Sequence, residues 1–299
     1  MKTKSNRITD IVDYIHDELK NKYPQSEIKA FINILFQEYV GINSAHILAF
    51  KDDCVNESEL LNIVLSTERL KKYEPIQYII GCTEFCGLKI KVTSDVLIPR
   101  PETEEMVYEI INTTRQNNVK QQNSDMREEK NINIIDLCTG SGCIALALDK
   151  NIKNSNVFGV DISDKALAIA KENNNNLACN VNFYKYDVLS PSATEDKYDI
   201  IVSNPPYVLE REKIDMKRNV LDYEPHLALF VKNENPLQFY EKIEIYARKN
   251  LKIGGKIFLE VNNFFVKDTL SLFSEKEYIA QVRKDIFNRE RFIFLQKKS

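Results

Sequence analysis

The sequence contains no tryptophan, little glycine and histidine, and no strong excess of charge of either sign. It has 299 residues with eight glycines and three histidines, and His16, His46 and His226 are too far apart in the chain to suggest a catalytic triad. The formal net charge is −3. This argues against a protein that binds nucleic acid regardless of sequence, because such proteins need a basic excess.

Long apolar runs are also missing, and none approaches the length of a membrane-spanning helix. The basic first residues are soon followed by Asp10, Asp13 and Asp17, which argues against a signal peptide. The six cysteines are scattered and lack the paired spacing of a zinc site. We therefore expect reduced thiols, no metal and a cytoplasmic location.

Helical periodicity marks the first part of the chain. Ser26 is expected to cap a second helix, and Asn56 with Glu59 resembles a capping box before a later one. The sequence thus predicts a small helical bundle over residues 1–73, with binding of a substrate protein as its expected role. Residues 74–95 should form a linker and a β-hairpin that turns at Cys86 and Gly87.

Strands and helices alternate after residue 96, which predicts an α/β domain over residues 96–299 with a mostly parallel sheet and helices on both faces. The polar residues 112–131 should form a frayed helix end and a solvent loop. Ligands of such sheets bind beyond the carboxyl ends of the strands. Chemistry is therefore expected at those ends.

One such end carries Asn204-Pro205-Pro206-Tyr207, directly after a predicted buried strand. The prolines hold the backbone extended, so these residues should form a rigid lip. A planar group with an NH2 would fit there: its hydrogens could bind the Asn204 side-chain oxygen and the Pro205 carbonyl, with its face against Tyr207. By itself the tetrapeptide is equally compatible with a plain turn.

A second set of candidate residues begins after the strand predicted at residues 132–137. Gly140 and Gly142 allow a ligand to approach the backbone, and the following helix offers N–H groups. Asp161, about twenty residues later, can accept ribose hydroxyls. Asp187 could accept an adenine amino group, and Val188 could cover the ring. The third glycine of the dinucleotide fingerprint is missing, which counts against NAD.

In this order and spacing the motifs resemble the class I S-adenosylmethionine-dependent methyltransferases, and the lip resembles that of members that methylate planar nitrogens. Three further segments narrow the resemblance to the PrmC/HemK family: residues 75–81 (PIQYIIG), 97–104 (LIPRPETE) and 223–229 (YEPHLAL). The likeness runs from about residue 74 to the end of the chain. It implies a Rossmann-like methyltransferase domain with a seven-stranded, mostly parallel sheet, and a helical bundle joined to it by the β-hairpin.

The resemblance also implies an activity. Members of the family methylate the side-chain amide nitrogen of the glutamine in the Gly-Gly-Gln motif of peptide chain release factors, which supports translation termination. It implies S-adenosylmethionine as cofactor and release factors as partners, with a monomeric enzyme and no membrane or direct nucleic-acid substrate.

The same likeness implies roles for individual residues. Asn204, Pro205 and Tyr207 would be catalytic. The cofactor would contact Cys138, Thr139, Gly140, Ser141, Gly142, Asp161, Asp187, Val188 and Asn204. The substrate would contact Asn204, Pro205, Pro206, Tyr207 and Arg100. Cys138 stands where many members have glycine, and its side chain is expected to point away from the ligand.

Three alternatives stay open. A sister enzyme that methylates a ribosomal-protein glutamine shares the lip, but typically has serine after the arginine where this chain has Pro101. A methyltransferase for exocyclic amines of DNA or RNA would use the same lip chemistry, yet needs a basic face. A non-catalytic cofactor-binding protein would have no need for Asn204.

Overall fold

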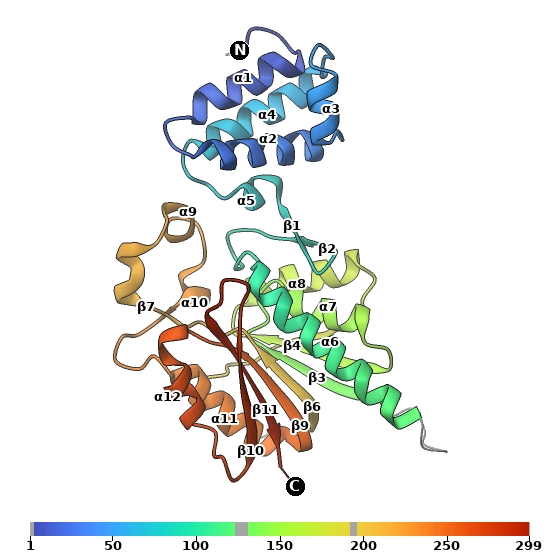
Figure 1. The fold of residues 1–299 in the computed structure, drawn as a ribbon, viewed down its shortest axis with the longest axis vertical. Coiled ribbons are helices and arrows are strands. Elements are labelled where there is room, and N and C mark those ends of the chain that lie inside the picture. The colour runs from blue at the N-terminus through green and yellow to red at the C-terminus, as the bar shows by residue number, and fades with distance from the viewer. Residues whose placement is uncertain (1–2, 123–130, 192–195, 299) are drawn as a thin grey trace. The chain divides into compact units, whose positions relative to one another are not determined.

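The computed structural model describes residues 3–122, 131–191 and 196–298. The chain divides into two compact units. One comprises residues 1–81 with 217–223, and the other comprises residues 82–216 with 224–299. Figure 1 traces the chain through both, from blue at the N-terminus to red at the C-terminus.

The smaller unit is helical, as predicted. Its helices are α1 (Ile8–Leu19), α2 (Gln25–Tyr39), α3 (Ser44–Ala49), α4 (Glu57–Leu70), α5 (Ile76–Ile80) and α9 (Arg218–Leu221). The capping box at the start of α4 is confirmed, since the Asn56 side chain accepts from the Glu59 N–H and the Glu59 carboxylate accepts from the Asn56 N–H. The predicted Ser26 cap is wrong. Pro24, with φ −65° and ψ 152°, is the N-cap instead, two residues before Ser26, and the helix begins at Gln25.

Residues 217–223, although distant in sequence, belong to the helical unit. The Tyr223 hydroxyl donates to the carbonyl of Lys72 over 2.9 Å. The Arg218 guanidinium lies 4.8 Å from the centre of the Tyr73 ring. A segment distant in sequence is therefore built into this unit by a hydrogen bond and a cation–π contact.

The larger unit contains a seven-stranded sheet in the order β10-β11-β9-β6-β3-β4-β5. Its strands are β3 (Ile132–Leu137), β4 (Ser155–Asp161), β5 (Asn182–Lys185), β6 (Tyr198–Ser203), β9 (Leu251–Glu260), β10 (Tyr278–Lys284) and β11 (Glu290–Lys297). All neighbouring pairs are parallel except the two that include β11. The predicted α/β class and the mostly parallel seven-stranded sheet are confirmed.

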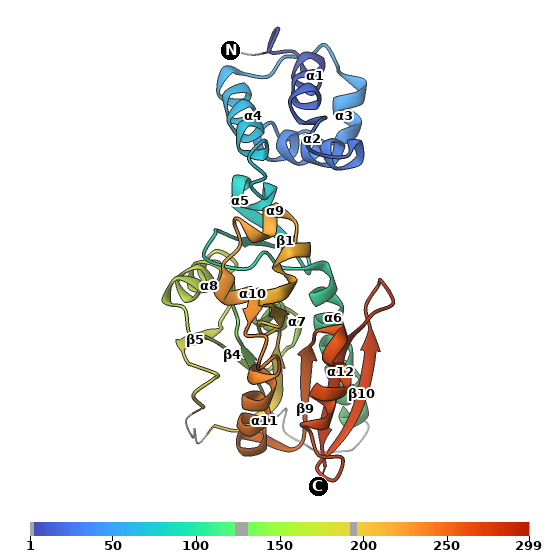
Figure 2. The ribbon, with the colours of Figure 1, turned by 90° about the vertical axis from the view of Figure 1, so that its left-hand side faces the viewer.

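Helices cover both faces of this sheet (Figure 1). On one face lie α6 (Pro101–Gln122), α7 (Cys143–Asn151) and α8 (Asp164–Asn176), and on the other lie α11 (Gln238–Asn250) and α12 (Val266–Ser271). The quarter turn in Figure 2 shows α11 and α12 in front of the sheet. Helix α6 continues to Gln122, so the first part of the polar stretch predicted over residues 112–131 is helical. Residues 123–130 of that stretch lie outside the described residues.

Short elements complete the larger unit. They are β1 (Cys82–Phe85), β2 (Leu88–Lys91), β7 (Val208–Leu209), η1 (Glu210–Asp215), α10 (His226–Leu229), β8 (Phe230–Val231) and η2 (Asn263–Phe265). The β1–β2 hairpin was predicted and is confirmed. Asn173 fastens it, because its buried side chain accepts from the Lys91 N–H over 2.7 Å and donates to the Lys91 and Ser141 carbonyls. Among the described residues no helix is long and apolar enough to cross a membrane.

Candidate active site

The register of the parallel strands brings the predicted motifs together. Leu137 of β3 pairs with Ser203 of β6 on one side and with Val160 of β4 on the other. The residues that follow these strands, Cys138 and Asn204, and Asp161 at the end of β4, therefore lie at one edge of the sheet. This is the edge where ligands of open α/β sheets bind.

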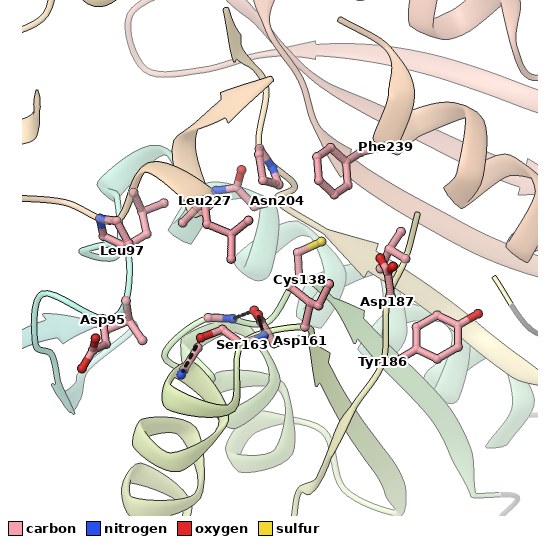
Figure 3. Close-up of a pocket in the computed structure, with 18 residues that line it drawn as sticks. Asp95, Leu97, Cys138, Asp161, Ser163, Tyr186, Asp187, Asn204, Leu227 and Phe239 are labelled. Atoms are coloured by element: carbon pink, nitrogen blue, oxygen red, sulfur yellow. Dashed lines mark hydrogen bonds between the residues drawn. The ribbon is translucent and has the colours of Figure 1, made fainter. Parts of the chain in front are cut away.

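A cavity opens at this edge (Figure 3). The predicted residues that line it are Cys138, Gly140, Asp161, Asp187, Val188, Asn204 and Pro206. In Figure 3 Asn204 and Phe239 lie on one side of the cavity, and Asp161 and Ser163 lie on the opposite side. The structure thus gathers part of the predicted lip and several of the predicted cofactor residues around a single space.

The glycine loop is built by its buried neighbours. The Thr139 hydroxyl donates to the Asp136 carboxylate over 2.5 Å, and Thr139 and Ser141 are both buried. These two residues support the loop from behind and do not line the cavity. Gly142 has φ 82° and precedes α7, where an added Cβ would lie 2.9 Å from the Phe183 ring. Only glycine fits this position without displacement or strain.

Cys138 has an unusual backbone conformation for a residue with a side chain. Its φ is 63°, in the left-handed region that glycine adopts at little cost, and it lines the cavity. Figure 3 shows its sulfur within the ring of lining side chains. Cys138 thus lines the cavity and also packs against the core of the larger unit. The expected direction of its side chain relative to the ligand stays a prediction. The backbone strain that such a residue implies is present.

Asp161 is held rigidly and remains open to the cavity. Its Oδ1 accepts from the Ser163 N–H over 2.9 Å, and its Oδ2 accepts from the Gly140 N–H over 2.9 Å. Desolvation raises the pKa of Asp161, while the backbone donors act in the opposite direction. Each carboxylate oxygen keeps a further lone pair, so the group can still accept a hydroxyl of a ligand.

The wall beyond Asp161 is mainly apolar. Val188 is 4% exposed, and Asp187 beside it uses Oδ1 to accept from the Leu189 N–H over 2.9 Å. Ile162, which is 43% exposed, and Tyr186 also line the cavity. An apolar slot with one carboxylate at its edge suits a planar heterocycle that carries an amino group.

The lip is only partly on the cavity wall. Asn204 and Pro206 line the cavity, whereas Pro205 and Tyr207 do not. The Asn204 Nδ2 donates to Thr103 Oγ1 over 3.2 Å, and its Oδ1 has no hydrogen-bond partner within the described part of the chain. The Tyr207 hydroxyl donates to the buried Glu260 carboxylate over 3.0 Å. Asn204, which lines the cavity, therefore keeps an unused acceptor.

Arg100 lies outside the cavity lining. Its Nη2 is 2.6 Å from Glu224 Oε1, and the Glu224 side chain is 1% exposed. Burial raises the pKa of Glu224, and the Arg100 charge opposes that effect. Glu224 directly precedes Pro225, which lines the cavity. The ion pair thus fastens the segment that forms this part of the wall.

Several lining residues were not predicted from the sequence. They are Asp95, Val96, Leu97, Ile162, Ser163, Ala166, Tyr186, Pro225, Leu227, Ala228 and Phe239. Leu97 and Leu227 lie within segments 97–104 and 223–229, which carry the family resemblance. Their place in these segments could have marked them as candidate site residues. Phe239 lies on α11 with no motif near it, so only the folded chain shows that it reaches the cavity.

The mostly parallel seven-stranded sheet, the glycine loop and the acidic residue that ends β4 define a class I methyltransferase fold and site. Among solved structures, the crystal structure of the hMettl16 catalytic domain in complex with a 3'UTR hairpin has a TM-score of 0.51, with 16% identity, and the match covers 93% of this chain and 94% of that one. At this identity the likeness shows the fold alone.

Family models and relatives narrow the class. Residues 10–81 match the PrmC N-terminal domain, and residues 122–223 match the methyltransferase small domain. The release factor glutamine methyltransferase of Bacteroides thetaiotaomicron is 43% identical over 96% of this chain and 98% of its own length. That of Flavobacterium psychrophilum is 38% identical over 92% and 94%. The chain belongs to the family of release factor glutamine methyltransferases.

Proposed function

We propose that this protein transfers a methyl group from S-adenosylmethionine to the side-chain amide nitrogen of the glutamine in the Gly-Gly-Gln motif of peptide chain release factors. The main observation behind this proposal is that Asn204 lines the same cavity as Asp161 and that its Oδ1 has no hydrogen-bond partner among the described residues. The near full-length similarity to relatives with this name supports the choice of substrate. The activity would serve translation termination in the cytoplasm.

The cavity fits the cofactor by its chemistry. Asp161 would accept ribose hydroxyls, Asp187 would accept the adenine amino group, and Val188 would cover the ring. Gly140 and Cys138 would lie beside the methionine part, with Thr139, Ser141 and Gly142 shaping the loop from behind. Bound S-adenosylmethionine supplies a methyl group on a sulfonium, which makes that carbon electrophilic.

The residues of the lip would act by positioning. An amide nitrogen is a weak nucleophile, and no strong base lies in the lip. The Asn204 oxygen and the Pro205 carbonyl would accept the two amide hydrogens and hold the nitrogen in line with the methyl group. Such alignment supplies several kcal/mol. Both acceptors interact more strongly as positive charge grows on nitrogen, so they favour the transition state.

The other elements would bind the protein substrate. The helical unit would contact the release factor, and Pro206 and Tyr207 would shape the place of the glutamine. Arg100 would act through its ion pair with Glu224, which fixes the wall segment. The enzyme would work as a monomer, one copy to one release factor.

The test uses radiolabelled S-adenosylmethionine with three acceptors: release factor, release factor whose motif glutamine is changed to alanine, and ribosomal RNA with ribosomal proteins. The proposal expects label on the first acceptor and none on the second. Label on the RNA or on a ribosomal protein, with none on the release factor, would replace it with one of the alternatives.

A further inference from the structure

A chain of hydrogen bonds runs behind Asn204. Thr103, in the first turn of α6, is 2% exposed, and Glu260, the last residue of β9, is 1% exposed. The Thr103 hydroxyl donates to Glu260 Oε2 over 2.6 Å, and its oxygen accepts from Asn204 Nδ2 over 3.2 Å. Three elements that are remote in sequence thus meet behind the lip.

The hydrogen bonds run in one direction, with Asn204 donating to Thr103 and Thr103 donating to Glu260. A hydroxyl carries one proton, and an ionised carboxylate can only accept. Because Thr103 gives its proton to Glu260, its oxygen is left to accept, and the group facing it must be a donor. The two ends of an asparagine amide have nearly the same shape, so only their partners decide which way the amide points. Here the NH2 faces Thr103, which leaves Oδ1 without a hydrogen-bond partner among the described residues.

Glu260 is itself held in place. Its second oxygen, Oε1, accepts from the Tyr207 hydroxyl over 3.0 Å. Desolvation raises the pKa of Glu260, while Thr103, Tyr207 and the Arg291 charge favour the ionised form and Glu102 opposes it. With both oxygens engaged, the carboxylate cannot rotate without losing a bond. Its orientation fixes that of Thr103.

We propose that Thr103 and Glu260 are positioning residues that hold the Asn204 amide with its oxygen toward the methyl acceptor. The inference rests on the proposed function, in which that oxygen binds an NH2 hydrogen of the substrate glutamine. A flipped Asn204 would set its own NH2 against the NH2 of the substrate, two donors with no acceptor between them. Thr103 prevents this arrangement without touching the substrate.

The kinetic test compares Thr103→Val, which keeps the shape and removes the hydroxyl, with Thr103→Ser, which keeps the hydroxyl. Thr103→Val should lower kcat about tenfold with the cofactor Kd unchanged, and Thr103→Ser should restore most of the turnover. The matched control is Thr114→Val. Thr114 is also buried on α6, but its hydroxyl donates to the Ile110 carbonyl over 2.8 Å and not to the lip. Its loss should leave kcat unaltered.

A double variant distinguishes a positioning role of Thr103 from a merely structural one. If Thr103 acts through Asn204, Thr103→Val should cause no further loss of kcat in an Asn204→Ala background. Full turnover in Thr103→Val, an equal loss in Thr103→Ser, or an additive loss in the double variant would overturn the proposal. If Thr103→Val does not fold, Thr103→Ala removes the same hydroxyl and has the same expected loss.

A measurement without substrate keeps this inference distinct from the proposed function. In protein labelled with isotope at asparagine, the side-chain amide signal that disappears in Asn204→Ala identifies Asn204. That signal should shift in Thr103→Val and return close to its original position in Thr103→Ser. An unmoved signal overturns the positioning role even if the release factor is methylated. A failure to methylate the release factor overturns the proposed function even if the signal moves.

Discussion

The Tyr207 hydroxyl donates a 3.0 Å hydrogen bond to the Glu260 carboxylate, which is buried in the larger unit. The tyrosine of the lip is therefore tied to the end of β9 by its hydroxyl, and its ring does not line the cavity. This bond makes the hydroxyl part of the structure behind Asn204. If only the face of the Tyr207 ring mattered, this hydrogen bond would have no purpose.

Tyr207→Phe should consequently destabilise the protein. The buried Glu260 carboxylate would lose one of its two hydroxyl donors, at a cost of about 1–3 kcal/mol in the free energy of unfolding. Tyr223→Phe is the matched control. The Tyr223 hydroxyl donates to the Lys72 carbonyl at an exposed position, so water can take the place of the lost hydroxyl and little stability should be lost. Urea unfolding of both variants checks this, and equal small losses would contradict the account.

The Arg100–Glu224 pair leads to a second prediction. Arg100→Met removes the charge and leaves a carboxylate that is 1% exposed with its main partner gone. A loss of about 3 kcal/mol is expected, because breaking one side of a buried pair leaves an uncompensated charge. Arg100→Met combined with Glu224→Gln should recover part of that loss. Thermal and urea unfolding of the three proteins measure it, and a double variant less stable than Arg100→Met would speak against the pair.

Stability should depend on pH through Asp136. Desolvation raises the pKa of this buried carboxyl to about 7, from an ordinary 3.8. The native state thus binds the proton more tightly than the unfolded chain. This group stabilises the protein fully below about pH 4, and the contribution is lost as the pH rises through 7, with a slope of at most about 1.4 kcal/mol per pH unit. Asp136→Asn should show a flatter profile than the parent in urea unfolding across this range, and parallel profiles would refute the assignment.

Cys138 should tolerate glycine. Its φ of 63° costs an L-residue about 1–2 kcal/mol, which glycine does not pay. Cys138→Gly is therefore expected to be at least as stable as the parent protein. The control Cys179→Gly, at a half-buried residue outside the left-handed region, should lose about 1 kcal/mol. Urea unfolding decides, and equal losses in both variants would show that no strain is released at Cys138.

The sequence predicted well what depends on local pattern. Strand and helix periodicity gave the alternation of the larger unit, and the position of Asn204 after a buried strand placed it correctly at the sheet edge. Pro24 overrode the capping preference of Ser26 because proline fixes the backbone one position before the helix.

Contacts between distant segments could not be predicted. Thr103 and Glu260 are 157 residues apart, and no periodicity links them. The glycine loop was recognised as a motif, but the sequence did not separate Gly140, which lines the cavity, from Thr139, which is buried against Asp136. The direction of each side chain depends on the folded loop and its buried partners.

The most direct test of the central claim is the comparison of Asn204→Ala with the parent protein, using release factor as acceptor. The account predicts that kcat falls about 100-fold or more, as when one oriented group that stabilises a transition state is removed, while the Kd of S-adenosylmethionine changes little. Methylation of the release factor glutamine at the parental rate by Asn204→Ala would contradict it.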